Sequence, residues 1–223
     1  MSKYTEERDK YQNDVRHLYD DSKMKKLVEK LLVFDKLIDL LVQWKIENNE
    51  QKEEEVLKDL TFIPLMKCLY IVCLLSVHKT KQETLFEVFD KFMAYQYGPV
   101  DEDCYYSIDE LPHYQINDNE VITKREGDGE QLFIDKFELT KAFYSSTLNK
   151  LNTNIFKMLE EAVTDLKNAL YFPSFKEKDN LIDLTHRELW EKAYRPDKFG
   201  VIDLNDKFAL LKEARDIRSV IAA

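Results

Sequence analysis

Glycine and proline are scarce in this chain, and their scarcity sets the first limit on its fold. Among 223 residues there are 4 glycines and 5 prolines, too few for the closely spaced turns of a sheet protein. Cysteine is equally rare: Cys68, Cys73 and Cys104 form an odd set, and two of them lie in one apolar run. We therefore expect long helices, with reduced core thiols rather than a disulfide framework.

Sequence motifs of catalysis and metal binding are also missing. The chain has no glycine-rich phosphate loop, no nucleophile elbow and no paired-histidine zinc motif. Cys68 and Cys73 lie about 140° apart around a helix, so they cannot bind one metal ion together. Carboxylates are so numerous that a solvated acidic surface explains any pair of them better than catalysis does. We expect no enzyme, no metal site and no cofactor. The scattered histidines are His17, His78, His113 and His186.

An excess of positive charge and a long apolar run are lacking as well. Lysine and arginine total 33 against 43 aspartates and glutamates, which gives a formal net charge of -10. The densest basic run is Lys23-Met24-Lys25-Lys26, so autonomous binding to nucleic acid or to an anionic membrane is disfavoured. The most apolar run, residues 63–77, is interrupted by Lys67 and is too short to cross a bilayer. No secretory signal is visible, and we expect a cytoplasmic protein.

Residues 23–45 carry the clearest helical pattern near the N-terminus. Apolar residues recur there at spacings of three and four, and the stripe is wider than a coiled-coil seam. Trp44, of a residue type favoured at binding hot spots, lies at its end. Two interpretations follow: the helix packs against the main core, or it binds a partner. The stripe consists of Met24, Leu27, Leu31, Phe34, Ile38 and Leu41.

Two further helices are predicted before a sharp break. Residues 64–75 are apolar on nearly every side, which predicts a helix in the middle of the domain. Residues 82–97 carry a broad apolar face and predict another helix. Gly98 and Pro99 follow it, and their backbone preferences predict a helix–turn–helix corner that leads into a short acidic helix. The tyrosines near its apex are Tyr95, Tyr97, Tyr105 and Tyr106.

A short β-segment interrupts the helical pattern. Residues 113–137 alternate in polarity around a Gly-Asp-Gly turn, which predicts a small hairpin or three short strands, the last at 131–134. Helices resume over residues 155–169 and 181–190. A last helix is predicted to start at a cap formed by Asp203. Its predicted apolar face consists of Phe208, Leu211, Ala214, Ile217 and Ile221.

His186 and the tyrosines each allow two interpretations. His186 stands four residues before Trp190, so both rings share one helical face. A catalytic base would need a nearby nucleophile, and the sequence points to none, which favours a buried structural histidine. The four tyrosines near Gly98 are either half-buried core residues or a preformed interface.

Three motifs occur in a characteristic order along the chain. They are Lys67-Cys68-Leu69-Tyr70, Ala94-Tyr95-Gln96-Tyr97-Gly98-Pro99-Val100 followed by Tyr105, and Leu181-Ile182-Asp183-Leu184-Thr185-His186 followed by Trp190. Together they resemble the Panacea domain, the SocA-like antitoxin domain also found in phage-associated proteins. The resemblance covers residues 56–196. Tyr95 stands where tryptophan is common in the family, and residues 1–55 and 113–137 have no counterpart that can be matched.

The resemblance implies a bacterial or phage antitoxin that neutralises a cognate toxin by direct protein contact, with a protease or chaperone as a further partner. The alternatives are a proteolytic adaptor or a phage-encoded interaction module without a toxin, a DNA-binding autoregulator, and an enzyme that uses His186 with carboxylates. The expected partner-binding residues are Trp44, Tyr95, Tyr97, Tyr105 and Tyr106. The expected structural motif comprises Gly98, Pro99, Val100, Thr185, His186 and Trp190.

The expected fold class is mainly α: a compact multi-helix domain with a small β-hairpin insertion and an N-terminal helical extension. The acidic run at residues 47–55 suggests the first boundary. We divide the chain into an extension over residues 1–55, a Panacea-like helical core over 56–200 that includes the hairpin at 113–137, and a C-terminal helix over 201–223 packed on the core.

Overall fold

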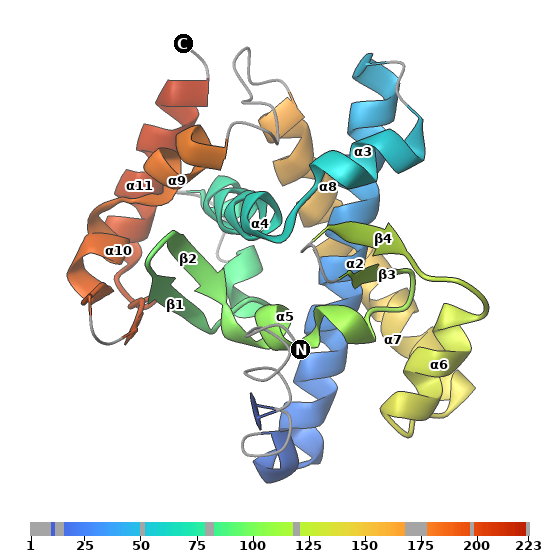
Figure 1. Ribbon diagram of the computed structural model, residues 1–223. Helices are drawn as coiled ribbons and strands as arrows, with labels where there is room; N and C mark the ends of the chain where they lie inside the picture. Colours follow the sequence, from blue (N-terminus) through green and yellow to red (C-terminus); the bar gives the residue numbers. More distant parts are fainter. Residues whose placement is uncertain are drawn as a thin grey trace.

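The fold is mainly α-helical, as expected, and it contains two small antiparallel sheets (Figure 1). The computed structural model describes residues 10–11, 16–49, 52–78, 83–117, 121–167, 178–196 and 199–221. Its helices, with 3-10 helices labelled η, are η1 (Arg16–Leu18), α2 (Asp21–Asn49), α3 (Glu53–Asp59), α4 (Phe62–Ser76), η2 (Leu85–Glu87), α5 (Glu102–Ser107), η3 (Ile108–Glu110), α6 (Gly129–Lys136), α7 (Lys141–Thr153), α8 (Ile155–Lys167), α9 (Lys178–Thr185), α10 (Glu188–Ala193) and α11 (Lys207–Ile221). Its strands are β1 (Phe92–Tyr95), β2 (Gly98–Asp101), β3 (Tyr114–Ile116), β4 (Ile122–Lys124) and β5 (Gly200–Val201).

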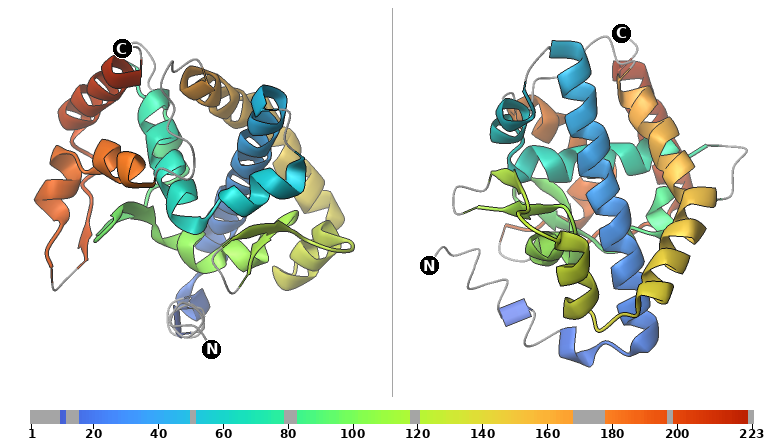
Figure 2. Two further views of the ribbon diagram at one scale, coloured as in Figure 1. Left: turned by 45° about the horizontal axis from the view of Figure 1, so that its top comes forward. Right: turned by 90° about the vertical axis from the view of Figure 1, so that its right-hand side faces the viewer.

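Helix α4 lies at the centre of the molecule. It packs against α8 on one side and against α9 and α11 on the other (Figure 2). Every side chain from Pro64 to Ser76 is buried, so the prediction of a central helix is confirmed. The three cysteines are free and buried, as expected for reduced core thiols. Among the described helices, none has both the length and the apolar character needed to span a membrane.

The apolar stripe of α2 faces the same core. Asp20 caps it, because the Asp20 carboxylate accepts a hydrogen bond from the Lys23 backbone at 2.8 Å. The helix packs against α3, α5, α7 and α8, and its side chains from Leu31 to Phe34 are at most 3% exposed. Trp44 is 6% exposed and belongs to the core cluster, so its side chain is not presented to a partner. The three-part division of the chain stays a prediction.

The helix predicted over residues 82–97 is wrong. A 3-10 turn and a loop occupy its first half, and β1 occupies most of the second half. β1 pairs with β2, with Tyr95 opposite Gly98, so the predicted helix–turn–helix corner is a β-hairpin. β5, about 100 residues later in the chain, pairs with the other edge of β1 and gives the order β2-β1-β5. Hydrogen bonds to neighbouring strands on both edges of β1 stabilise the strand more than the local sequence pattern would stabilise a helix.

The second hairpin is confirmed, but its predicted third strand is not formed. β3 and β4 pair antiparallel, with Gln115 opposite Thr123. Residues 131–134 lie in α6 instead. The carboxylate of Asp128 accepts a hydrogen bond from the Gln131 backbone at 3.0 Å and so caps this helix. The Gly-Asp-Gly turn therefore ends the β-segment and starts a helix.

The C-terminal helix α11 starts three residues later than predicted. Asp206 caps it by accepting a hydrogen bond from the Ala209 backbone at 2.9 Å, whereas Asp203 closes a local turn with Asn205. Ala214 and Ile217 are buried as expected, but Phe208 is 81% exposed. Residues 168–177, which include the end of the helix predicted over 155–169, lie outside the described residues.

Candidate functional site

The three sequence motifs meet around the turn of the β1–β2 hairpin. Lys67, from α4, donates a hydrogen bond to the Pro99 carbonyl at 3.0 Å. Trp190, from α10, donates its indole N–H to the Tyr95 carbonyl at 2.9 Å. Thr185, the last residue of α9, lies against the turn and is fully buried. Residues that are far apart in sequence thus hold one hairpin.

Gly98 is required at this turn for two separate reasons. Its φ of +102° lies in the region that favours glycine. A Cβ atom at this position would lie 2.8 Å from Thr185 Oγ1 and 2.9 Å from Lys67 Nζ, closer than real Cβ contacts. The turn, the end of α9 and the Lys67 side chain therefore interlock.

The side-chain amine of Lys67 is buried in the core. It is 1% exposed, and within the described part of the chain no carboxylate forms an ion pair with it. Burial lowers the pKa of Lys67 to about 7, because an apolar environment disfavours the charged form. The hydrogen bond to the Pro99 carbonyl gives the buried amine a polar partner.

His186 and Trp190 stack on one another, although the helix predicted to carry both is broken between them. α9 ends at Thr185 and α10 begins at Glu188. The imidazole and indole rings lie 3.7 Å apart and nearly parallel, and Tyr194 extends the stack at 4.6 Å. Burial, followed by the charge of Lys67, lowers the pKa of His186. Its Nε2 atom is buried and has no hydrogen-bond partner, an arrangement that supports a packing role for the ring.

The outward face of the β2-β1-β5 sheet is apolar and partly uncovered. The register places Met93 and Val201 side by side on this face, and Tyr95 lies next but one to Met93 along β1. The ring of Phe199 stacks on Tyr95 at 4.2 Å. Val201 is 68% exposed and Phe199 is 49% exposed. The opposite face is fully buried, since Phe92 packs against the aromatic core.

The predicted tyrosines extend this face and differ in exposure. Tyr105 contacts Tyr95 at 5.7 Å and Tyr106 at 4.7 Å between ring centroids, so these three form one aromatic cluster. Tyr97, at the tip of the hairpin, is 53% exposed. Tyr11 stacks on Tyr106 at 4.4 Å, a contact that no sequence pattern indicated. We call Met93, Tyr95, Tyr97, Tyr105, Tyr106, Phe199 and Val201 the aromatic face.

A buried ionic network, which the sequence analysis missed, supports the base of the hairpin. Lys30 of α2 is 2% exposed, and its amine lies 3.2 Å from Asp101 and 2.7 Å from Asp103. Burial alone would raise the pKa of Asp103, but the charge of Lys30, the hydrogen bonds from Lys30 and Tyr11 and the charge of Lys91 together lower that pKa to about 2. Tyr11 and Tyr19 also donate to the Asp103 carboxylate. The only sequence signal was a lysine inside an apolar stripe.

Acidic side chains lie near His186 and near Tyr95. Asp183 and Glu191 are exposed, and both charges act on His186. Glu102 forms an ion pair with Lys91 at 2.7 Å, and its charge also acts on Tyr95. Among the described residues, no group of three or more histidine, cysteine, aspartate or glutamate side chains is placed to hold a metal ion.

No family model matches the chain, and neither a curated protein nor a solved structure matches it. The resemblance to the Panacea domain stays a prediction that rests on the three motifs.

Proposed function

We propose that this protein is an antitoxin-like protein of the cytoplasm that neutralises a cognate toxin by direct contact through the aromatic face. The observation that carries the proposal is the outward side of the β2-β1-β5 sheet. An antiparallel sheet that faces water normally presents polar side chains there. This sheet presents Tyr95 and Val201 instead, and Phe199, which precedes β5, stacks on Tyr95. Exposed apolar patches of this kind mark interaction sites.

The scaffold behind the aromatic face supports a binding role. Lys67, Thr185 and Trp190 fix the hairpin from behind, so a partner would meet a surface that is already ordered. Preformed surfaces lose little conformational entropy on binding. Tyrosine also supplies a large contact area with few rotatable bonds, which suits it to such an interface.

The charge of the chain supports a basic partner. The formal net charge is -10, and the exposed carboxylates of Asp183 and Glu191 act on His186, whose ring stacks on Trp190, the residue that bonds to Tyr95 of the aromatic face. A partner with a basic surface would be steered toward this region, and association would slow as salt is added. A toxin that acts on RNA or nucleotides through a basic surface fits this description.

The test is a binding measurement with the product of the neighbouring reading frame, after co-expression and purification of both proteins. Phe199→Ala and Tyr97→Ala should each weaken binding by at least about 2 kcal/mol if they are hot spots, roughly 30-fold in Kd. Leu132→Ala is the matched control, because Leu132 is 54% exposed but lies on α6. Folded variants that bind and neutralise like the wild type would contradict the proposal.

A further inference from the structure

A groove of about 740 Å³ lies beside the β2-β1-β5 sheet, between η2 with the loop that follows it and the segment from β5 to α11. It is on the side of the molecule that carries β1 and α11 (Figure 1). Val201 lines this groove and also belongs to the aromatic face. The two surfaces are therefore continuous, and a partner that covers the aromatic face can extend into the groove.

Apolar side chains line much of the groove. Phe86 and Leu210 are buried, at 6% and 5% exposure. Leu204 and Leu211 are half-buried, and Val201 is 68% exposed. Concave sites that bind a ligand typically measure about 300–1,000 Å³ and have such a lining. The groove therefore has the size and the apolar surface to take up a side chain of a partner.

Carboxylates outnumber cations around this apolar surface. Glu87, Asp90 and Asp203 line the groove against one lysine, Lys207, so the described lining residues carry two negative charges in excess when histidine is counted as neutral. The Glu87 carboxylate is exposed and forms no ion pair in the described part of the chain. Asp90 shares the single amine of Lys30 with two other carboxylates, so it is only partly neutralised.

The arginine next to the groove does not cancel this excess. Arg218 contacts the lining residue His78, with 3.3 Å between Nη2 and Nε2. The same Nη2 donates to the carbonyls of Leu75 and Val77 at 2.6 and 2.8 Å. These carbonyls are at the C-terminal end of α4, where the helix dipole already attracts a cation. Even with Arg218 counted, the groove keeps a negative charge and favours a basic occupant.

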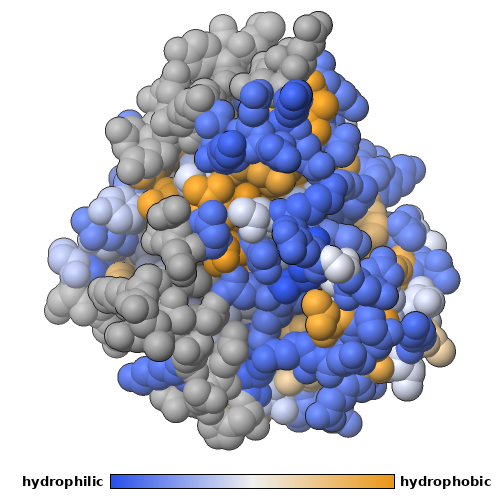
Figure 3. All heavy atoms as spheres, turned by 45° about the vertical axis from the view of Figure 1, so that its right-hand side comes forward, coloured by the Kyte–Doolittle hydropathy of each residue, from blue (hydrophilic) through white to orange (hydrophobic). Residues whose placement is uncertain are grey.

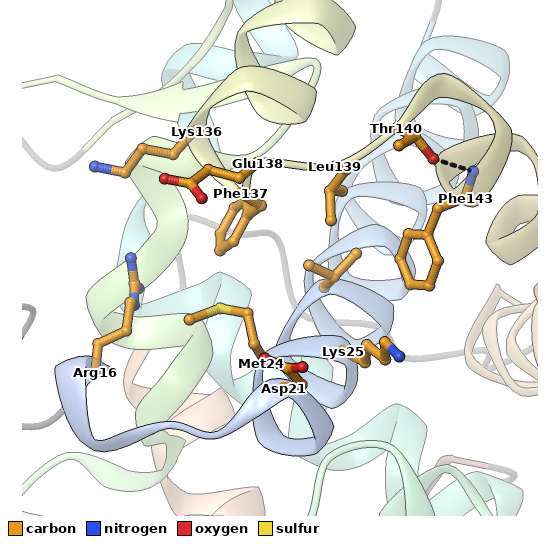
Figure 4. A pocket seen from close by; sticks show the side chains of 11 residues that line it. Arg16, Asp21, Met24, Lys25, Lys136, Phe137, Glu138, Leu139, Thr140 and Phe143 are labelled. Atoms are coloured by element: carbon orange, nitrogen blue, oxygen red, sulfur yellow. Dashed lines mark hydrogen bonds between the residues drawn. The ribbon is translucent and has the colours of Figure 1, made fainter.

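A second groove shows that size and apolar lining alone do not select an occupant. It measures about 780 Å³ and lies between the first turns of α2 and the connection from α6 to α7 (Figure 4), on a side of the molecule where the surface is largely hydrophilic with separate apolar patches (Figure 3). Arg16 pairs with Glu110 there. Lys25 and Lys136 lie on opposite sides of the apolar residues (Figure 4). Their charges are balanced by those of Asp21 and Glu138.

We propose that the groove between η2 and α11 binds a basic segment of the partner protein, with an apolar side chain against Phe86 and Leu211 and an arginine or lysine beside Glu87 and Asp90. This inference rests on the proposed function, because the segment belongs to the protein that covers the aromatic face and reaches the groove past Val201. The methylene stem of the basic residue can itself cover apolar surface while its charge stays at the carboxylates. An acidic segment would be repelled, so the groove adds specificity.

The first experiment measures the groove without the partner. A fluorescein-labelled hexapeptide of alternating arginine and leucine is titrated with the full chain in about 0.15 M salt, and its fluorescence anisotropy is followed. Saturable one-to-one binding is expected, at least about tenfold tighter than that of the glutamine–leucine counterpart. Equal binding of the two peptides, or no binding, would overturn the proposal. So would displacement of the peptide by an equal concentration of spermine, since the groove would then attract any cation.

Matched variants locate the peptide. Glu87→Lys should weaken its binding at least about fivefold. Glu126→Lys changes the net charge equally at an exposed position between β4 and α6, and it should leave binding unchanged. Leu211→Ala should weaken binding about fivefold by removing apolar contact, whereas Leu132→Ala on α6 should not. Equal responses of variants and controls would place the peptide elsewhere and refute the proposal.

The second experiment separates a failure of this inference from a failure of the proposed function. It measures binding of the neighbouring reading frame's product to Glu87→Lys and to Phe199→Ala. Weaker binding of both variants is expected. If only Phe199→Ala weakens binding, the aromatic face binds the partner and the groove does not, which overturns this inference alone. If neither variant weakens binding, the proposed function is wrong and the inference is wrong with it.

Discussion

Substitution of Gly98 by alanine is the sharpest test of the interlocked hairpin. An alanine there must adopt a φ of +102°, which costs about 1–2 kcal/mol. Its Cβ would also lie 2.8 Å from Thr185 Oγ1 and 2.9 Å from Lys67 Nζ. Lys67 must then move and lose its hydrogen bond to the Pro99 carbonyl. A buried donor left without a partner costs about 1–3 kcal/mol more.

The expected loss for Gly98→Ala is therefore about 2–5 kcal/mol, a large share of the stability of an ordinary domain, about 5–15 kcal/mol. Urea unfolding, followed by circular dichroism and by tryptophan fluorescence, measures it. Both probes should report one transition with an unchanged slope.

Gly127→Ala is the matched control. Gly127 also has a positive φ, +77°, but a Cβ atom there would meet nothing within 4 Å. This variant should lose only the stability that a positive φ costs an alanine, about 1–2 kcal/mol. If Gly98→Ala costs no more than Gly127→Ala, the contacts with Thr185 and Lys67 do not restrict the turn. Adding Thr185→Ala to Gly98→Ala should recover part of the loss.

Four further outcomes are expected. The pKa of Lys67 is about 7 in the fold against 10.5 when unfolded, so the unfolded chain binds the extra proton and the contribution of Lys67 to stability should rise with pH from 7 to 10.5. Burial raises the pKa of each of the three cysteines above the ordinary 9.0, which opposes this rise at higher pH. The difference in urea midpoint between the wild type and Lys67→Met should therefore shift in favour of the wild type as pH rises from 7 to 9, and a difference that does not depend on pH would refute the prediction. Trp190→Ala should cost about 3 kcal/mol in thermal melts, because a half-buried stack and a hydrogen bond are lost. A loss below about 1 kcal/mol would show that the stack is dispensable. Asp103→Asn should cost about 2 kcal/mol, the free energy that corresponds to a pKa of about 2 against the ordinary 3.8, because Lys30 keeps Asp90 at 2.9 Å and Asp101 at 3.2 Å. The wild type should lose this contribution as pH falls from 3.8 to 2, whereas the variant should not. Glu138→Gly should raise the free energy of unfolding by about 1 kcal/mol by removing backbone strain, and a drop would show that the side chain stabilises its turn.

The long helices could be predicted from sequence because their burial follows local periodicity. In α4 nearly every residue is apolar, and nearly every residue is buried. In α2 the spacing of Leu27, Leu31 and Phe34 identified the buried stripe, and Trp44 at its end is buried as well. The periodicity could not show whether the core of this protein or a binding partner covers the stripe. In the fold, the core covers it.

The β1–β2 hairpin could not be predicted from local pattern because its stabilisation comes from distant residues. The run from Leu85 to Met93 has helical spacing of apolar residues, yet β1 bonds to β5 about 100 residues later. Phe199 joins the aromatic face for the same reason, and Tyr11 reaches Tyr106 from the N-terminal segment. By contrast, Tyr95, Tyr105 and Tyr106 were predicted to lie near one another because they flank one turn.

The dependence of the hairpin on α9, α10 and β5 has a consequence for synthesis on the ribosome. β1 and β2 are complete once Asp101 has been made, but their third strand ends at Val201, about 100 residues and roughly 5–20 seconds of translation later. Helices α2 and α4 can pair before that point. The aromatic face is therefore assembled last, and a nascent chain presents no finished binding surface until nearly all of the protein has emerged.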